Sequence, residues 1–179
     1  MKNILIVVAN PKEDSFSFAM ANKYKNKCKE KNYDVEFLDL YRDENQQPFF
    51  TNEQVTTKEM KYYQEKISKA DEITFVFPYW WGSMPAILKN FIDWNFSNGF
   101  AFEYVNSRPH GLLKGKSVKV FTTTGAPYLF YMLTGAHRRL RSMLKEQIIE
   151  FCGMKFEEFN IFGGVDTSKK KMQKILDKI

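Results

Sequence analysis

Strand-like and helix-like stretches alternate along the 179-residue chain. Short apolar runs and alternating stretches predict five strands, and apolar residues at helical spacing occupy the segments between them. The predicted strands are Ile4–Ala9, Val35–Leu40, Ile73–Phe77, Ser117–Thr122 and Phe156–Phe162. Strands that alternate with helices are joined by crossovers, which place them parallel in one sheet. The pattern therefore predicts a single α/β domain over residues 1–179.

The helices are predicted from apolar stripes after each strand. Thr51 and Gln54 resemble a capping box, which predicts the start of the second helix and its extension to about Lys69. A longer helix is predicted over His137–Cys152. Residues 96–113 contain four aromatic side chains. We therefore expect an ordered excursion there rather than a linker.

Composition adds aromatic surface and positive charge to this picture. Aromatic residues make up 16% of the chain, more than a core of this size needs, so some are expected to hold a flat ligand or a partner. The formal net charge is +6, and no acidic residue occurs between Tyr104 and Lys145. Such a stretch would attract an anion such as a dinucleotide phosphate, or simply form a solvated basic face. Nucleic-acid binding is not expected, because the aromatics cluster at strand ends rather than along a basic stripe.

Several classes of site are not expected. Cys28 and Cys152 are far apart in the sequence and fit the apolar faces of helices, which predicts buried free thiols in a reducing cytosol. No His, Cys or carboxylate set has the spacing of metal ligands, so no metal is predicted. The chain has no apolar stretch of the roughly 18–20 residues that span a membrane, and no signal-peptide pattern. These features predict a cytoplasmic protein.

Ligands of open parallel sheets bind beyond the carboxyl ends of the strands. This rule selects three loops, at Asn10–Ser17, Pro78–Pro85 and Thr123–His137. In the first loop, the backbone N–H groups that open a helix and the hydroxyls of Ser15 and Ser17 suit a phosphate. The alternative is that Ser15 serves only as the helix N-cap.

The other two loops suit a flavin ring. The three large aromatics of Tyr79–Trp81 cannot all enter one core, so at least one is expected to face the ligand crevice, where a flat isoalloxazine would fit. The alternative is that the two tryptophans pack against a helix. The Thr123–Gly125 turn can direct several N–H donors at one acceptor. Donors of this kind would stabilise the negative charge that a reduced flavin carries near N1 and O2.

Taken in order, the three loops resemble those of the NAD(P)H quinone oxidoreductase family, the DT-diaphorase-like branch of the flavodoxin superfamily. Bacterial ancillary quinone reductases of potassium-efflux systems belong to the same group. The most specific parts are Phe77–Lys89, Gly99–Tyr104 and Thr123–Gly125. The resemblance implies a flavodoxin-like three-layer sandwich. Its five-stranded parallel sheet would have the order 2-1-3-4-5, with helices on both faces.

The resemblance also implies a flavin site, with NAD(P)H as electron donor. The implied cofactor contacts are Asn10, Ser15, Phe16, Ser17, Pro78, Tyr79, Trp80, Trp81, Thr123, Thr124, Gly125 and Ala126. Tyr131 and His137 would be catalytic, and Phe102 and Tyr104 would line a substrate-binding mouth at a homodimer interface. Many family members have His in place of Asn10 and a second Gly in place of Ala126. FMN is favoured over FAD because the chain is short.

The predicted function is that of a flavin-dependent NAD(P)H dehydrogenase (quinone). Hydride would pass from NAD(P)H to flavin, and two electrons would then pass to a quinone-like acceptor. Because donor and acceptor would share one site, we expect ping-pong kinetics. The alternatives are a flavodoxin-type electron carrier and a redox-sensing regulatory subunit, peripherally associated with a membrane transporter. The acceptor and the choice between NADH and NADPH stay open, although Arg138, Arg139 and Arg141 could hold a 2′-phosphate.

Overall fold

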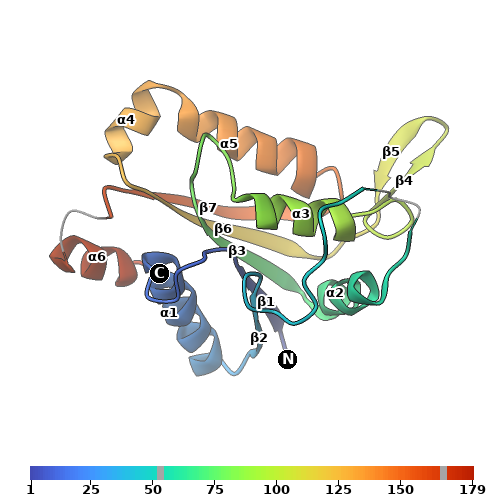
Figure 1. Ribbon diagram of the computed structural model, residues 1–179, viewed down its shortest axis with the longest axis horizontal. Coiled ribbons are helices and arrows are strands. Elements are labelled where there is room, and N and C mark those ends of the chain that lie inside the picture. The colour runs from blue at the N-terminus through green and yellow to red at the C-terminus, as the bar shows by residue number, and fades with distance from the viewer. Residues whose placement is uncertain (52–54, 166–168) are drawn as a thin grey trace.

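The computed structural model describes residues 1–51, 55–165 and 169–179. A five-stranded sheet forms the centre of this described part (Figure 1). Its strands are β1 (Asn3–Val8), β2 (Asp34–Asp39), β3 (Glu72–Pro78), β6 (Ser117–Thr124) and β7 (Lys155–Gly163). The strand order is β2-β1-β3-β6-β7, and every neighbouring pair is parallel. The predicted order 2-1-3-4-5 is confirmed.

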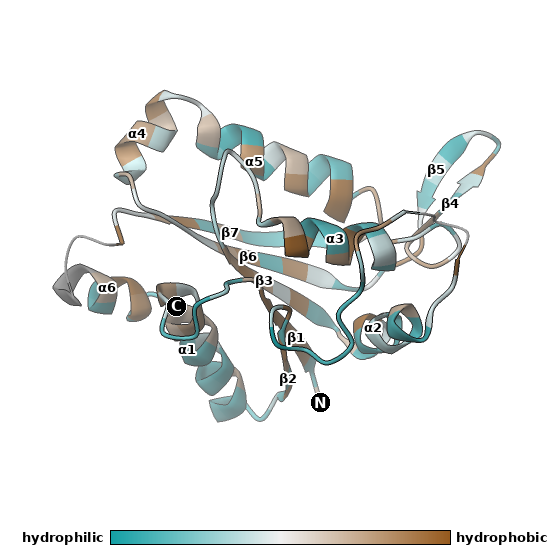
Figure 2. Ribbon diagram, viewed as in Figure 1, coloured by the Kyte–Doolittle hydropathy of each residue, from teal (hydrophilic) through white to brown (hydrophobic). Residues whose placement is uncertain are grey.

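Helices cover both faces of the sheet, as predicted. The main ones are α1 (Phe16–Glu30), α2 (Lys58–Lys69), α3 (Ala86–Asn95), α5 (Ala136–Leu144) and α6 (Lys169–Leu176). Side chains of α1 and α6 pack in one core cluster, whereas those of α2, α3 and α5 pack in the other. Alternate residues of β1 face opposite sides of the sheet. Leu5 packs in the cluster with α2, α3 and α5, whereas Ile4 and Ile6 pack in the cluster with α1 and α6. The apolar residues accordingly gather in the central strands, and polar residues lie outside (Figure 2).

The start of α2 differs from the prediction. The helix begins at Lys58, and its N-cap is Thr57, whose side chain accepts a hydrogen bond from the Met60 N–H at 3.1 Å. Thr51 does not open the helix, and Gln54 lies outside the described residues. Thr57 followed by acidic Glu59 in the first turn gives a helix start of the same chemical kind, six residues further along the chain.

The predicted helix over 137–152 is also more complex. Its first part is α5, and its continuation is a π-helical segment, η1 (Lys145–Ile149), in which the Glu150 N–H bonds to the Lys145 carbonyl at 2.8 Å. A further short helix, α4 (Tyr128–Leu133), lies within the third loop and was not predicted. Its six residues are mostly exposed, so it has no inward-facing apolar stripe of the kind that reveals a helix in sequence.

The aromatic excursion contains a β-hairpin, formed by β4 (Phe102–Val105) and β5 (Arg108–Gly111). The hairpin lies at the opposite end of the molecule from α4 and α6 (Figure 1). The Phe102 ring packs on Phe151, with 4.9 Å between centroids. A Cβ on Gly111 would lie 2.1 Å from the backbone nitrogen of Gly153, so the two chain segments touch directly. The excursion is therefore ordered, as expected.

Candidate functional site

A cavity of about 430 Å³ lies at the carboxyl ends of β1, β3 and β6. Its volume falls within the roughly 300–1,000 Å³ typical of small-molecule sites. All three predicted loops contribute to it. The predicted cofactor contacts that line it are Asn10, Ser15, Phe16, Ser17, Pro78, Tyr79, Trp80, Thr123, Thr124 and Gly125. Trp81 and Ala126 do not line it.

Five lining residues were absent from the predicted contacts. Pro11, Lys12 and Asp14 belong to the first loop, where their position between predicted contacts could have identified them. Val165 and Met172 come from the segment after β7, 28 and 35 residues beyond the end of the third loop at His137. No motif marks these two residues, because only the chain crossing that sets β7 beside β6 brings them to the cavity.

One corner of the cavity is built at the start of α1. The Asn10 amide donates a hydrogen bond to Ser17 Oγ at 3.1 Å, and Asn10 Oδ1 accepts one from the Lys12 N–H at 3.0 Å. Ser15 caps the helix by accepting from the Phe18 N–H at 3.4 Å. The first N–H groups of a helix lack intrahelical partners and carry the positive end of its dipole. With Lys12 beside them, they fit a phosphate group.

An aromatic wall closes the second side of the cavity. Tyr79 is buried, and its N–H donates to the Thr123 carbonyl at 2.8 Å, which joins the second and third loops. Trp80 borders the cavity with 42% of its surface exposed. Trp81 is fully exposed and points away into solvent. Two of the three aromatics therefore face the crevice, and neither tryptophan is part of a buried helix interface.

The third loop is held by its own hydrogen bonds. Thr124 Oγ1 donates to the Ala126 carbonyl at 2.9 Å. The Gly164 N–H approaches the carbonyls of both Thr124 and Ala126, each at 2.9 Å. Thr123 and Thr124 are buried, whereas Gly125 is exposed at the cavity. A turn fixed in this way can keep its N–H groups in place for an acceptor without reorganisation.

Tyr131 lies behind the aromatic wall. Its ring meets that of Tyr79 edge to face, with 5.2 Å between centroids and an angle of 82°. Phe130 packs on the other side of Tyr131 at 5.6 Å. Tyr131 therefore contacts a cavity-lining residue but does not itself line the cavity.

His137 lies in the first turn of α5 and also stands outside the cavity lining. Its ring packs between Tyr128, at 5.8 Å, and Phe159, at 5.3 Å. Burial lowers the pKa of His137 below its ordinary value, and the positive charge of Arg141 lowers it further. The imidazole is therefore neutral at pH 7, when it can donate one hydrogen bond and accept another.

Phe102 and Tyr104 are not brought to this cavity. Both lie on the hairpin at the opposite end of the molecule (Figure 1). Phe102 borders a separate groove of about 610 Å³ between α3 and the η1 segment, and Tyr104 is 59% exposed. Within one chain, these residues cannot form the mouth of the site at the strand ends.

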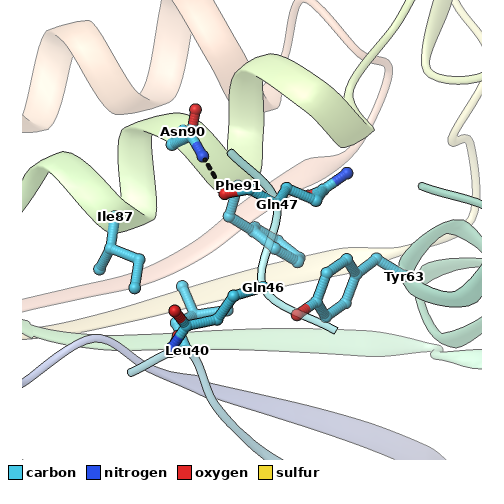
Figure 3. A pocket seen from close by; sticks show the side chains of 7 residues that line it. All are labelled: Leu40, Gln46, Gln47, Tyr63, Ile87, Asn90 and Phe91. Carbon is cyan, nitrogen blue, oxygen red and sulfur yellow. Dashed lines mark hydrogen bonds between the residues drawn. The ribbon is translucent and has the colours of Figure 1, made fainter. Parts of the chain in front are cut away.

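A small cavity of about 30 Å³ lies where the segment after β2 crosses α3 (Figure 3). The Asn90 amide donates to the carbonyls of Gln47, at 3.2 Å, and Pro48, at 3.0 Å, and Asn90 Oδ1 accepts from the Phe50 N–H at 2.8 Å. The space suffices for about one water molecule. The contacts tie α3 to the segment after β2, and α3 directly follows the loop that carries the aromatic wall.

The positively charged stretch does not form one patch. Lys116 donates to the carbonyls of Ser68 and Ala70 at the end of α2, each at 2.7 Å, and Lys119 pairs with Glu72 and Glu158.

Within the described ranges, no cluster of His, Cys, Asp and Glu is arranged to hold a metal ion. Nor does any described helix have the length and apolar character needed to cross a membrane. Cys28 and Cys152 are free and buried, as expected.

A family model described as having a flavodoxin-like fold matches residues 2–179. An "uncharacterized NAD(P)H oxidoreductase" of Haemophilus influenzae is 32% identical, over 97% of this chain and 90% of that protein. An FMN-dependent NADH:quinone oxidoreductase of Coprothermobacter proteolyticus is also 32% identical, over 72% of this chain and 71% of its own. The crystal structure of Smu.1420 from Streptococcus mutans is 31% identical with a TM-score of 0.83, covering 98% of this chain and 95% of that one. The sheet, the three loops and these similarities agree: the chain belongs to the flavodoxin-like NAD(P)H quinone oxidoreductase family.

Proposed function

We propose that this protein is an FMN-dependent NAD(P)H dehydrogenase that reduces quinones, with the cofactor in the 430 Å³ cavity. The observation that carries the proposal is the cavity itself, which has a helix N-terminus at one corner and aromatic rings and a rigid Thr-Thr-Gly turn around the rest. When bound, flavin supplies a two-electron carrier: NAD(P)H, one proton and a quinone become NAD(P)⁺ and a hydroquinone. FMN is favoured because a relative is named as FMN-dependent.

Three loops of the chain would bind different parts of the flavin. The start of α1, with Ser15, Ser17 and Lys12, would hold the phosphate. Trp80 and the buried Tyr79 would flank the ring. The backbone N–H groups of Thr123–Gly125 would face the edge on which negative charge develops.

Tyr131 and the neutral His137 would act next to this wall. In the family resemblance both lie beside flavin and substrate, and here Tyr131 touches the wall through Tyr79. A phenol and a neutral imidazole can each donate a hydrogen bond. They would stabilise an oxygen that gains negative charge during reduction. One shared site for nicotinamide and quinone would give ping-pong kinetics.

A homodimer would explain where Phe102 and Tyr104 act. The hairpin that carries them is remote from the cavity of its own chain, so they could reach a substrate only in the cavity of a second copy. A sedimentation equilibrium mass equal to one chain would contradict this assembly. Peripheral association with a membrane transporter and a cytoplasmic location stay predictions.

The decisive experiment is an absorbance spectrum of the purified protein with FMN, before and after anaerobic addition of NADPH or NADH. We expect flavin bands that bleach within seconds and return when a soluble 1,4-naphthoquinone is added. Bleaching without return on quinone addition would favour an electron carrier over a quinone reductase. Absence of flavin uptake would overturn the proposal.

A further inference from the structure

The side chain of Asn10 is tied into the first loop at both ends of its amide. Its Oδ1 accepts a hydrogen bond from the Lys12 N–H at 3.0 Å, and its Nδ2 lies 3.1 Å from Ser17 Oγ. Asn10 is 7% exposed and Ser17 is 1% exposed, yet both line the cavity. The Asn10–Ser17 pair is therefore a buried polar contact in the wall of the proposed flavin site.

The two partners of this amide determine the direction of its hydrogen bonds. A backbone N–H can only donate, so the amide atom that faces Lys12 is the oxygen. The opposite end of the amide is then the NH2 group, which can also only donate. Ser17 Oγ is therefore the acceptor in its contact with Asn10, and the Ser17 hydroxyl proton points elsewhere.

The Ser17 proton has no acceptor of its own in the described part of the chain. Among those residues, no side chain or carbonyl takes a hydrogen bond from Ser17 Oγ. A buried donor without an acceptor is unfavourable, and a ligand that accepts its proton removes that cost. Because Ser17 lines the cavity, a ligand in the cavity can be that acceptor.

Two backbone donors come from the same turn. The first intrahelical bond of α1 runs from the Ala19 N–H to the Ser15 carbonyl, at 3.1 Å, and the Phe18 N–H is used by the Ser15 side chain. The N–H groups of Phe16 and Ser17 precede these, where a helix offers no intrahelical acceptor. The Ser17 hydroxyl thus adds a third donor to two backbone N–H groups within two consecutive residues.

The charged side chains at this corner leave no surplus of positive charge. Lys12 and Asp14, of opposite charge, both line the cavity. Glu13 pairs with Arg42 at 2.9 Å, and Arg42 also pairs with Asp39 at 2.8 Å. The attraction for an anion therefore has to come from oriented hydrogen-bond donors, so the direction of the Ser17 proton matters.

We propose that Asn10 is a positioning residue for the cofactor phosphate: by donating to Ser17 Oγ, it directs the Ser17 proton to a phosphate oxygen. The inference rests on the proposed function, because it takes the phosphate to be that of FMN. Asn10 acts through Ser17, so the phosphate meets donors and no acceptor from this pair. An aspartate at position 10 would keep the bond to Lys12 but would accept the Ser17 proton, which reverses the polarity of the contact.

Titration of the flavin-free protein with FMN and with riboflavin, followed by quenching of flavin fluorescence, tests this role. Asn10→Asp should weaken FMN binding about 100-fold, because it withdraws a donor and adds a negative charge. Ser17→Ala should weaken it about tenfold. Both should change the Kd of riboflavin by less than about threefold, since riboflavin has no phosphate. Asn22→Asp, which adds the same charge at an exposed position of α1, is the matched control and should bind FMN normally.

A double-mutant cycle separates positioning from direct contact. If Asn10 acts through Ser17, Asn10→Asp should cost only about tenfold in FMN affinity in the Ser17→Ala background, where no Ser17 proton is left to redirect. Equal costs in both backgrounds would overturn the inference. Thermal unfolding of the flavin-free variants shows whether they fold. Should Asn10→Asp fail to fold, Asn10→Ala takes its place, with an expected loss of about tenfold alone and none beyond that of Ser17→Ala.

The ratio of the two flavin affinities distinguishes the remaining outcomes. A loss of riboflavin affinity as large as the loss of FMN affinity would overturn the inference, because the substitution would then have distorted the whole cavity. Wild-type FMN affinity in Asn10→Asp would overturn it as well. Failure of the wild-type protein to bind either flavin would overturn the proposed function itself, before any variant is compared.

Discussion

At the scale of single residues, the polar groups around the cavity are positioned by hydrogen bonds and ring contacts with their neighbours. Asn10 is buried and uses both ends of its amide within the first loop. His137 is packed between two aromatic rings, and Arg141, one helical turn further on, adds a positive charge. Arg141 in turn lies over the ring of Phe156 at 5.4 Å. The protonation of His137 is therefore sensitive to a residue outside the cavity.

Arg141→Gln should move the acid limb of the kcat profile to higher pH. The charge of Arg141 disfavours protonation of His137, so its loss raises the pKa of the imidazole and the neutral form is lost at a higher pH. Steady-state reduction of a soluble quinone between pH 5 and 8 measures the shift. Arg141→Lys keeps the charge and should keep the wild-type profile. His137→Ala should lose kcat roughly 100-fold if the imidazole participates. If the profile of Arg141→Gln is not shifted, the acid limb does not report the protonation of His137.

At the scale of elements, β3 begins with a charged residue that is 1% exposed, Glu72. Lys2 and Thr74 donate to its carboxylate at 2.7 and 3.2 Å, and Tyr24 of α1 donates as well. Burial alone would raise the pKa of Glu72, but the hydrogen bonds from Lys2 and Tyr24, with the charge of Lys119, outweigh it and hold the pKa below its ordinary value. The network ties the first strand and helix to the centre of the sheet.

Glu72→Gln should lower the free energy of unfolding by about 3 kcal/mol at pH 7. Because the folded-state pKa lies below the ordinary value, the carboxylate stabilises the fold at neutral pH. That contribution is lost as the pH falls through the lowered pKa, so the stabilities of wild type and variant should converge only at pH values below the ordinary pKa of a glutamate. Urea denaturation at several pH values tests this. Glu65→Gln, which breaks an exposed pair with Lys69, should leave stability unchanged.

The contact between the hairpin and the η1 end leaves no room for a side chain. Gly111→Ala would place its Cβ 2.1 Å from the Gly153 backbone nitrogen, so one segment must move. We expect a loss of at least about 2 kcal/mol in unfolding free energy. Gly99→Ala is the control, since φ is +81° there but no atom lies within 4 Å. It should cost about 1 kcal/mol from backbone strain. Equal losses of unfolding free energy in both variants would show that the close contact at Gly111 adds nothing to the cost of the substitution.

At the scale of the whole molecule, segments from four strand ends enclose one cavity. The loops after β1, β3 and β6 form its walls, and Val165, directly after β7, adds to its lining. The hairpin extends from the other end of the molecule (Figure 1). A ligand in the cavity contacts most of the sheet's carboxyl edge and should stabilise the folded state as a unit.

FMN at 100 times its Kd should raise the free energy of unfolding by about 2.7 kcal/mol, because it binds only the folded chain. Thermal unfolding with increasing FMN, riboflavin or FAD measures the effect. Riboflavin should stabilise less, since it lacks the phosphate that the start of α1 would hold. Equal stabilisation by riboflavin would argue against that corner as a phosphate site.

Much of this architecture could be predicted because strands and helices follow the spacing of apolar and polar residues over short segments of the chain. The continuous apolar run of β3 reports burial on both faces, and the alternation of strands and helices specifies parallel crossovers. Since parallel strands finish at one edge, their loops had to meet, and most predicted contacts line one cavity. The start of α2 was misplaced because Thr51 and Thr57 are both of a residue type that caps helices, and it is Thr57 that accepts the capping hydrogen bond.

The sequence pattern by itself determined the strands, the helices between them and the three loops, because periodicity and turn chemistry act between near neighbours. The strand order was implied by the family resemblance. Only the tertiary structure decided that Val165 and Met172 reach the cavity, that Trp81 faces solvent, and that Phe102 lies at the far end of the molecule. These outcomes depend on chain crossings and backbone angles that no short segment encodes. The burial of a side chain depends on the packing of the whole fold. Neighbouring aromatic residues of one loop therefore have different surroundings: Tyr79 is buried in the cavity wall, whereas Trp81 is exposed to solvent.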